Sequence, residues 1–433
     1  MADSGWHPHL WHPLRRTGEG LAPLPVRRGR GVWLELEDGR QLIDAISSWW
    51  VTLHGHGEPT IAAAIAAQAR DLEQVIFADF RHGPAARLAE RLCGHWPGLS
   101  RVFFSDDGST AVEVALKLAW QHQQRLDPQR RQLIAFEGAY HGDTVGAMAV
   151  GSRGLFNAPF EPLLFPVARA PWPATWWDDD GVDAREAAAL QSLEALLQTP
   201  TVAVILEPLV QGASGMAMVR PSFLRGVAER TRAAGALLIA DEVLTGFGRT
   251  GHLFACRGAG LTPDLVALSK GLTGGFLPMS VTLAGETLHQ SFCGADPAAT
   301  FFHGHSFTAN PLGCAAALAS LDLLEADPGR PHRLEQLHRP RLQILARHPL
   351  VQRPRLLGTI AAFDLRGPSG YLQPAGRELQ RLCLAQGVYL RPLGSVVYLM
   401  PPLVISAAEL DRCYARSEEH TSELQSRVDI SYA

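Results

Sequence analysis

The chain has 433 residues, 46% of them hydrophobic, and its 39 basic residues nearly balance its 43 acidic ones. This length allows a large buried core, and the near-neutral charge without long runs of one sign argues against nucleic acid or an anionic membrane as a partner. No apolar run reaches the length of a membrane span, and the six cysteines are scattered without CxxC pairs, so we expect a cytoplasmic protein with reduced thiols.

The N-terminal region predicts an arm, a hairpin and two helices. Residues 1–30 are rich in Pro, Gly and Arg and predict an irregular arm. Residues 31–50, GVWLELEDGRQLIDAISSWW, alternate apolar and polar residues around an Asp-Gly turn pair, which predicts a β-hairpin. Residues 60–75 and 83–96 have the apolar spacing of amphipathic helices.

Strands and helices then alternate, which is the pattern of a mainly parallel α/β sheet wrapped by helices. The runs RVFFS and QLIAFE are predicted strands with a helix between them. Three almost wholly apolar runs at 201–209, 235–243 and 264–270 are typical of strands buried on both faces. The segment 157–185, rich in Pro, Trp and Asp, predicts a surface excursion.

The C-terminal part of the chain mixes predicted helices with short strands and indicates a separate α+β domain, which follows a helix beginning near Asn310. The final stretch, RSEEHTSELQSRVDISYA (416–433), is polar and carries no apolar face for packing. We therefore predict a foreign, disordered extension there and leave it out of functional reasoning.

Lysine occurs at only two positions, Lys117 and Lys270, although arginine is frequent. A buried ammonium can lose its proton and attack a carbonyl to form a Schiff base, whereas a guanidinium stays charged. Lys270 stands at the end of the apolar run 264–270, and ligands of open α/β sheets bind at such strand ends. Lys117 falls inside a predicted helix and is expected to be a solvated charge. In the plainer alternative, both lysines carry ordinary charges.

Other strand ends also carry polar groups. Gly108 and Ser109 open a predicted helix, where free N–H groups suit a phosphate, although such residues are also ordinary helix caps. Tyr140 lies between glycines, which suits a ring that stacks on a flat ligand, although a core tyrosine is the plainer alternative. Asp241 and Glu242 follow an apolar strand, and one of the two carboxylates needs a cationic partner.

Taken with Lys270, these residues match what pyridoxal phosphate requires: a phosphate site, a stacking ring, a carboxylate at the pyridine nitrogen and a Schiff-base lysine. No metal site is expected, because the histidines at 54–57 and 303–305 lack HExxH or clustered carboxylate spacing. Glu207 is left open as a catalytic or a structural acid. Arg249 is expected in an internal ion pair.

The runs LLIADEVLTGFGRTG and PDLVALSKGLTGG resemble the signature of the class III pyridoxal-phosphate aminotransferases, and the likeness extends from about residue 10 to 415. The resemblance implies fold type I, an α/β fold. Its large cofactor-binding domain (51–320) holds a seven-stranded, mostly parallel sheet, and a smaller α+β domain is built from both termini (1–50 and 321–415). It also implies a homodimer with active sites at the interface.

Within this family, the stretches SSWW, GAYHGDT, HGHSFTANPLGCAAA and RPLGSVVYLMPP resemble the branch that acts in biotin biosynthesis. That branch transfers an amino group from S-adenosylmethionine to 8-amino-7-oxononanoate and forms 7,8-diaminononanoate. The resemblance implies catalytic roles for Lys270 as the Schiff-base lysine, Asp241 at the pyridine nitrogen and Tyr140 over the cofactor.

The same resemblance implies three groups of binding residues. Gly108 and Ser109 would bind the cofactor phosphate, while His305 and Ser306 would reach the phosphate of the neighbouring subunit's cofactor. The substrate pocket would be lined by Trp49, Tyr140, Lys270, Gly304 and Arg391. Of these, Arg391 would bind a carboxylate through two hydrogen bonds.

Three positions depart from the pattern of the family. Leu14 stands where a tyrosine usually follows WHP, and leucine cannot donate a hydroxyl bond. His305 is larger than the usual residue and titratable, and Asp107 adds a second carboxylate to the phosphate turn. Other activities therefore stay open: a class III transaminase that uses an ω-amino acid or diamine with pyruvate or a 2-oxo acid, an aminomutase, or a non-catalytic nucleotide-binding protein.

Overall fold

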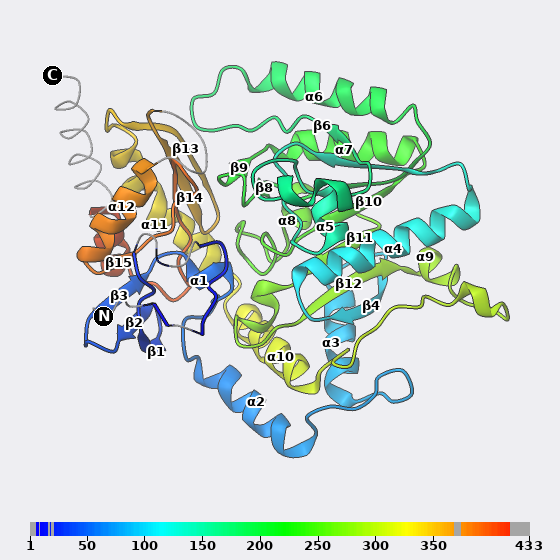
Figure 1. The fold of residues 1–433 in the computed structure, drawn as a ribbon, viewed down its shortest axis with the longest axis horizontal. Coiled ribbons are helices and arrows are strands. Elements are labelled where there is room, and N and C mark those ends of the chain that lie inside the picture. The colour runs from blue at the N-terminus through cyan, green and yellow to red at the C-terminus, as the bar shows by residue number, and fades with distance from the viewer. Residues whose placement is uncertain (1–5, 8, 16–17, 19–20, 368–373, 416–433) are drawn as a thin grey trace.

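The structure, a computed structural model, describes residues 6–7, 9–15, 18, 21–367 and 374–415. Its elements divide between a larger part built on one wide sheet and a smaller part that contains both ends of the described chain (Figure 1). The extension predicted at 416–433 lies outside the described residues. Within the part of the chain that the structure describes, no helix is long and apolar enough to cross a membrane.

The larger part is built on a seven-stranded, mostly parallel sheet, as predicted. In spatial order the strands are β4 (Leu99–Ser105), β12 (Ser280–Gly285), β11 (Leu265–Leu268), β10 (Leu237–Asp241), β7 (Thr201–Leu206), β5 (Gln132–Phe136) and β6 (Ala168–Ala170). Among these seven described strands, β12 alone runs antiparallel to its neighbours. The three apolar runs form β7, β10 and β11, and their side chains are almost all buried because helices cover both faces.

Two strands of this sheet are not indicated by the sequence. β12 inserts between β4 and β11, so that Leu283 pairs with Val102 on one side and Val266 on the other. β6 lies inside the segment expected to be a surface excursion, where it pairs with β5 and forms an edge of the sheet. An edge strand of three residues is held mainly by backbone hydrogen bonds, so it leaves little trace in the side-chain pattern.

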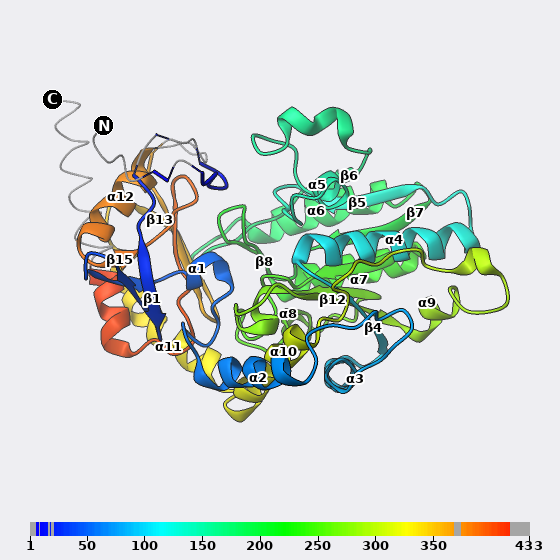
Figure 2. The ribbon, with the colours of Figure 1, turned by 60° about the horizontal axis from the view of Figure 1, so that its bottom comes forward.

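Helices form the outer layers on both sides of the sheet (Figures 1 and 2). The predicted amphipathic helices correspond to α2 and α3, and α10 packs against both of them. In the larger part the helices are α2 (Pro59–Asp71), α3 (Gly83–Gly94), α4 (Gly108–Leu126), α5 (Val145–Val150), α6 (Val182–Leu196), α7 (Pro221–Ala233), α8 (Ala255–Ala259), α9 (Glu286–Gln290) and α10 (Pro311–Ala326).

The smaller part joins segments from opposite ends of the chain (Figure 1). One sheet contains β1 (Val26–Arg30), β2 (Trp33–Leu36), β3 (Gln41–Asp44) and β15 (Val388–Tyr389), and β15 pairs parallel with β3. A second sheet contains β13 (Val351–Leu357), β14 (Ile360–Leu365) and β16 (Val396–Leu399). The helices α11 (Arg330–Leu345) and α12 (Pro374–Ala385) also belong to this part, and α1 (Ser47–Trp50) leads from it toward the larger part.

The predicted hairpin is formed by β2 and β3, which pair antiparallel with Trp33 opposite Ile43. The arm expected to be irregular as far as residue 30 ends instead in β1, which pairs antiparallel with β2. This strand contains three arginines and is mostly exposed; its backbone pairs with β2, and Arg27 and Arg28 also form ion pairs with Glu35 of β2. Its sequence therefore shows no apolar alternation.

Candidate active site

The carboxyl ends of the central parallel strands bring together the polar residues expected to carry chemistry. Asp241 is the last residue of β10, and Lys270 follows the neighbouring strand β11. Glu207 follows β7 on the other side of β10, and Tyr140 lies in the turn after β5. Because these strands are parallel, their ends share one edge of the sheet, where open α/β folds bind ligands.

Lys270 begins a short 3-10 helix (Lys270–Thr273) with φ 44°, a left-handed conformation that is unusual for a residue with a side chain. Its Nζ lies 5.5 Å from the centre of the Trp50 ring. Burial lowers the pKa of the Lys270 amine below its usual range, although the negative charges of Asp241 and Glu207 oppose the shift. The neutral, nucleophilic form of this amine is therefore more accessible than that of a solvated lysine.

Asp241 is only 4% exposed, and both of its oxygens accept hydrogen bonds. Oδ2 accepts from His141 Nδ1 at 2.7 Å, and Oδ1 accepts from the Val243 backbone N–H at 3.0 Å. Burial acts to lower the pKa of His141, but the bond to Asp241 and the charge of that carboxylate outweigh it and raise the pKa overall. His141 is a functional candidate that the sequence reasoning missed, although it directly follows Tyr140 in the stretch GAYHGDT.

The neighbouring carboxylate, Glu242, points into a different environment. It accepts hydrogen bonds from the backbone N–H groups of Ala255 at 2.8 Å and Cys256 at 2.7 Å, the first residues of α8. Burial raises the pKa of Glu242 to about 7. One of the two carboxylates was expected to have a cationic partner. That partner is His141, which binds Asp241, whereas Glu242 accepts hydrogen bonds from backbone N–H groups at the start of α8.

Glu207 connects two loops at the same edge. Its Oε1 accepts from the Tyr140 backbone N–H and its Oε2 from that of Gly212, each at 3.0 Å. Burial raises the pKa of Glu207 to about 7, while the charge of His141 acts in the opposite direction. These contacts show that the Glu207 carboxylate binds the backbone that carries Tyr140.

The predicted phosphate site lies where β4 leads into α4. The Ser109 hydroxyl accepts from the Thr144 backbone N–H at 3.0 Å and lies 2.8 Å from the Thr144 hydroxyl, which in turn donates to Glu113 at 2.6 Å. Gly142 has φ 127°, and a Cβ at that position would collide with Ser109. A glycine is therefore needed for the 138–144 turn to approach the start of α4 this closely.

Asp107, the unusual second carboxylate of this turn, is occupied as the N-cap of α4. Its Oδ1 accepts from the Thr110 backbone N–H at 3.0 Å, while the Thr110 hydroxyl accepts from the Asp107 backbone N–H, a capping box. The first carboxylate, Asp106, lies 3.3 Å from His305 Nδ1, an atom that can either donate to this carboxylate or accept from the Phe307 backbone N–H, but not both. Asp107 is thus engaged by the helix start, while Asp106 lies beside the His305 imidazole.

The 303–306 segment lies on the surface of the described chain. Gly304 and Ser306 are exposed, and the Ser306 carbonyl accepts from Gln74 Nε2 at 3.0 Å. Within the described residues, the hydrogen bond of Ser306 thus leads to Gln74 and not to the start of α4. Lys117, expected to be a solvated charge, is exposed but also lies 2.9 Å from His303 Nδ1 and above the Phe301 ring. Lys117 is thus not only solvated, as was expected, because the imidazole of His303 approaches it on the surface of α4.

Trp49 and Arg391 meet from opposite ends of the chain. The guanidinium carbon of Arg391 lies 5.0 Å from the centre of the Trp49 ring, and the Trp49 side chain is 44% exposed. A third residue, Arg15, lies nearby. Its own pKa is lowered by burial and also by the positive charge of Arg391. Leu14 is largely exposed beside Arg15 and has φ 55°. The aromatic ring of Trp49 and the positive charge of Arg391 thus lie next to each other.

The family model described as aminotransferase class-III matches residues 16–419, nearly the whole chain. The chain belongs to the class III aminotransferases. Its expected enzyme class, a transferase of amino groups, is thereby confirmed.

Relatives and solved structures of this class resemble the chain over almost its full length. The adenosylmethionine-8-amino-7-oxononanoate aminotransferase of Synechococcus elongatus is 57% identical over 423 residues, which cover 96% of this chain and 99% of that protein. The crystal structure of the enzyme of the same name from Methanocaldococcus jannaschii has a TM-score of 0.88, 32% identity, and coverage of 96% and 97% of the two chains. A PLP-bound amine transaminase from an uncultivated Pseudomonas species has a TM-score of 0.89, 30% identity, and coverage of 96% and 99%.

The strand-end residues of this class III aminotransferase fit pyridoxal phosphate, the cofactor bound in that amine transaminase. The backbone N–H groups of Gly108 and Ser109 have no acceptor among the described residues, and this is the arrangement that binds a phosphate at a helix start. The buried Nε2 of His141 likewise lacks a partner within the described chain. Asp241 supplies a buried carboxylate for a ring nitrogen, and Lys270 supplies an amine of lowered pKa for an aldehyde.

Arg249 differs from its expected role in an internal ion pair. Its guanidinium is buried and donates to two backbone carbonyls, Pro401 O at 3.2 Å and Trp50 O at 3.3 Å. Burial lowers the pKa of Arg249 to about 10, and the charge of Asp44 opposes the shift. Within the described residues no carboxylate comes within ion-pair distance of Arg249, which instead connects the Trp50 segment to the chain around residue 401.

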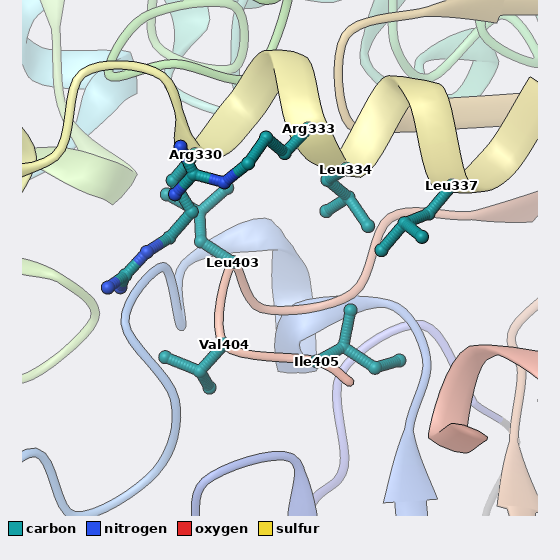
Figure 3. A pocket seen from close by; sticks show the side chains of 7 residues that line it. All are labelled: Arg330, Arg333, Leu334, Leu337, Leu403, Val404 and Ile405. Carbon is teal, nitrogen blue, oxygen red and sulfur yellow. The ribbon is translucent and has the colours of Figure 1, made fainter. Parts of the chain in front are cut away.

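A second concave site has a different character. A cavity of about 300 Å³ lies between α11 and the segment 403–405, as Figure 3 shows. Its lining consists of Arg330, Arg333, Leu334, Leu337, Leu403, Val404 and Ile405. Both arginines also approach the same carboxylate, that of Asp327. The cavity holds no acid, amine or histidine suited to proton transfer.

Across the described residues, no three His, Cys, Asp or Glu side chains form a group that could hold a metal ion.

Proposed function

We propose that this class III aminotransferase uses pyridoxal phosphate to transfer an amino group from S-adenosylmethionine to 8-amino-7-oxononanoate, forming 7,8-diaminononanoate in biotin biosynthesis. The observation that carries the proposal is the Trp49–Arg391 pair, because the acceptor has an apolar chain that ends in a carboxylate. The name and 57% identity of the Synechococcus elongatus relative support the same substrates. We also infer a cytoplasmic location, where cysteines that are scattered along the chain without CxxC pairs stay reduced.

When bound, the cofactor supplies the electron sink that lets the Cα–H bond of an amino substrate break. Lys270 would hold the cofactor aldehyde and would carry the released proton, a role that its lowered pKa suits. Asp241, which accepts a hydrogen bond from His141, would keep the ring nitrogen protonated. Gly108 and Ser109 would bind the phosphate through the free N–H groups of the helix start.

Tyr140 and Arg391 complete the reaction site from two sides. Tyr140, on a backbone positioned by Glu207, would supply the aromatic ring that stacks on the cofactor beside the substrate. Arg391 would bind the carboxylate of the acceptor through two hydrogen bonds from its guanidinium, while Trp49 supplies the apolar surface beside it. Gly304, which has no side chain, leaves space beside the substrate.

The active form is proposed to be a homodimer. Phe302 is 78% exposed and Phe307 61% exposed, and they flank His305 and Ser306 on one surface segment. Large apolar side chains gathered on a surface are typical of an interface that a partner covers. A second copy that covered this segment would bring His305 and Ser306 to the partner subunit's cofactor phosphate and Gly304 to its substrate.

A donor screen tests the proposal. Purified protein loaded with pyridoxal phosphate is incubated with 8-amino-7-oxononanoate and, in separate reactions, with S-adenosylmethionine, an ω-amino acid or a diamine. Mass spectrometry is expected to detect 7,8-diaminononanoate with S-adenosylmethionine. Amination of pyruvate by simple ω-amines, with no diaminononanoate from any donor, would support the alternative class III activity. Product from a single substrate without a second one would identify an aminomutase.

A further inference from the structure

The segment that carries both indoles of the substrate site has a strained backbone. Ser47, Ser48 and Trp50 have φ values of 54°, 59° and 68°, in the left-handed region that residues with side chains seldom adopt. Ser48 combines its φ with ψ −106°, a conformation suited to glycine. Strained residues of this kind persist only where their surroundings hold them.

Asp44 holds this segment from the inside. It ends β3, its side chain is fully buried, and it accepts four hydrogen bonds. Oδ1 accepts from the Ile46 backbone N–H at 3.2 Å. Oδ2 accepts from the backbone N–H of Ser48 at 2.6 Å, from the Ser48 hydroxyl at 3.2 Å and from His56 Nε2 at 2.9 Å. A single carboxylate thus connects Ile46 and Ser48 to His56.

The far side of the segment is attached to the C-terminal part of the chain. The Ser47 hydroxyl donates to Met400 O at 2.8 Å, and the Trp50 indole N–H donates to the Tyr398 hydroxyl at 2.8 Å. Arg249 donates to Trp50 O. The backbone is therefore held from two directions, by Asp44 on one side and by these donors and acceptors on the other.

The two indoles face different functional groups. The Trp50 ring lies 5.5 Å from Lys270 Nζ, and the Trp49 ring lies 5.0 Å from the guanidinium carbon of Arg391. Trp49 itself has ordinary negative φ, so its direction depends on the left-handed residues on either side. The conformation of this short segment therefore determines where the indoles of Trp49 and Trp50, an apolar wall, lie between the Lys270 amine and the Arg391 guanidinium.

We propose that Asp44, with His56 as its partner, is a positioning residue that keeps the Ser47–Trp50 segment in its strained conformation and thereby sets the acceptor-binding wall formed by Trp49 and Trp50. The proposal deepens the proposed function, on which its substrate readout rests. A carboxylate is required here because only a charged group with two acceptor oxygens can serve four donors at once.

The first test is Asp44→Asn. The amide keeps one oxygen, but its NH2 group cannot accept from Ser48 or His56. We expect KM for 8-amino-7-oxononanoate to rise roughly tenfold while kcat changes little, because hydrogen bonds that hold a strained turn are lost but the catalytic groups stay. Quenching of tryptophan fluorescence by acrylamide should increase, and absorption of the bound cofactor should stay unchanged.

A second substitution separates positioning from a general loss of stability. Glycine adopts left-handed conformations without strain, so Asp44→Asn combined with Ser48→Gly should recover a large part of the lost acceptor affinity. If the double variant binds the acceptor no better than Asp44→Asn alone, the strain that Asp44 is proposed to hold is not what sets the wall.

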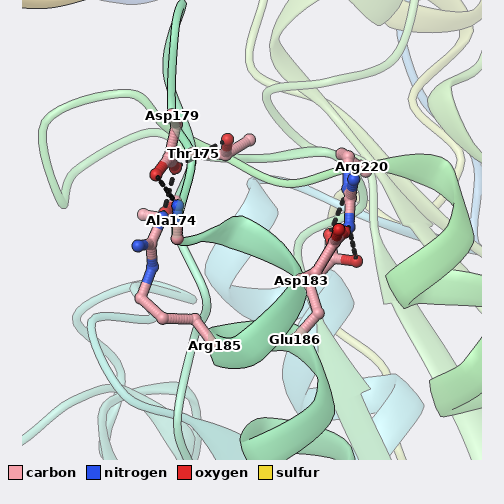
Figure 4. A network of polar contacts seen from close by, with 8 residues as sticks. Ala174, Thr175, Asp179, Asp183, Arg185, Glu186 and Arg220 are labelled. Atoms are coloured by element: carbon pink, nitrogen blue, oxygen red, sulfur yellow. Dashed lines mark hydrogen bonds and ion pairs between the residues drawn. The ribbon is translucent and has the colours of Figure 1, made fainter.

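Asp179 offers a matched control, shown in Figure 4. Its buried carboxylate accepts from the Gly181 backbone N–H at 3.2 Å and from the Thr175 hydroxyl at 2.9 Å, and it pairs with Arg185. Asp179→Asn therefore makes the same chemical change at another buried turn. It should lower the melting temperature without raising KM for the acceptor. An equal rise of KM in both variants would reduce Asp44 to a general structural role and overturn the proposal.

His56 provides a route that does not depend on the folding of the Asp44 variant. His56→Leu removes one donor to Asp44 and should raise KM for the acceptor, whereas His56→Gln, whose amide can donate in its place, should restore it. If wild-type protein does not use 8-amino-7-oxononanoate at all, the proposed function fails, and acrylamide quenching of Trp49 and Trp50 still tests the positional role. Unchanged quenching in both Asp44→Asn and His56→Leu would contradict it.

Discussion

Replacing Asp241 by asparagine removes one negative charge and leaves the side-chain shape almost unchanged. In the native structure, Oδ1 accepts from the Val243 N–H at 3.0 Å and Oδ2 accepts from His141 Nδ1 at 2.7 Å. The asparagine amide has a single oxygen, so it can satisfy only one of these donors. If the oxygen stays with Val243, an NH2 group faces the Nδ1–H of His141, and the imidazole must lose that proton.

The expected magnitude follows from burial. Asp241 is 4% exposed, so its charge is little screened by solvent. Hydrogen bonds to charged groups contribute about 1.5–3 kcal/mol, and removal of one preorganised group from an active site costs about 2.7–4 kcal/mol of transition-state stabilisation. We therefore expect Asp241→Asn to slow the half-reaction with the amino donor by about 10²- to 10³-fold, while pyridoxal phosphate is retained weakly.

Stopped-flow absorbance of the cofactor during a single turnover with the donor measures this rate directly. Glu242→Gln is the matched control, because Glu242 is the adjacent buried carboxylate but binds the start of α8. It should reduce thermal stability and leave the half-reaction rate close to that of the wild type. A near-normal rate in Asp241→Asn would refute the role assigned to Asp241.

The remaining predictions concern the amine, the acceptor, the interface and pH. Borohydride reduction of the loaded protein followed by peptide mapping should label Lys270, and Lys270→Arg should keep the fold without turnover; a label on Lys117 would contradict the assignment. Arg391→Ala should weaken use of the acceptor by roughly 2–5 kcal/mol and affect the half-reaction with S-adenosylmethionine much less. Mixing Lys270→Ala with Ser306→Trp chains should restore partial activity through hybrid dimers; full activity from a demonstrated monomer would refute shared sites. Burial raises the pKa of Glu207 from 4.5 to about 7, so its contribution to stability is fully present below about pH 4.5 and is lost as pH rises toward 7, a decline that Glu207→Gln should flatten in melting-temperature measurements.

The central strands could be predicted from the sequence because each is fully buried and therefore uniformly apolar. The runs that became β7, β10 and β11 stand out for this reason, and the residues at their ends, Glu207, Asp241 and Lys270, follow from position alone. In contrast, β6 at the sheet edge is held mainly by backbone hydrogen bonds, which leave no mark on side-chain identity. The arginine-rich β1 adds ion pairs from Arg27 and Arg28 to Glu35, and such charged pairs do not produce the apolar alternation by which a strand is predicted. The same limit applies to β12, whose place between β4 and β11 depends on pairing over long distances.

Partners across space were harder to predict than residues at strand ends. The sequence indicated that an acid beside an apolar strand needs a cation, but not that His141, a hundred positions away, supplies it. Arg249 was expected to bind a carboxylate and binds backbone carbonyls instead, because the fold brings Trp50 and Pro401 to it before any acid. Asp44 has no motif of its own, and its four donors become visible only when the backbone conformation of Ser48 is known.

The pairing of β15 with β3 has a consequence for the growing chain. The strands β4, β12 and β11, which join the phosphate turn to the strand end before Lys270, all lie before residue 286, so this side of the sheet has emerged while the ribosome still has more than a third of the sequence to translate. The edge of β3 stays without its parallel neighbour, and Trp49 without Arg391, until residues 388–391 have emerged. A chain released early would therefore expose an open strand edge, a template for association with other chains, while lacking the cation of the acceptor site. The wide sheet is thus translated well before the sheet that joins β3 to β15 can close.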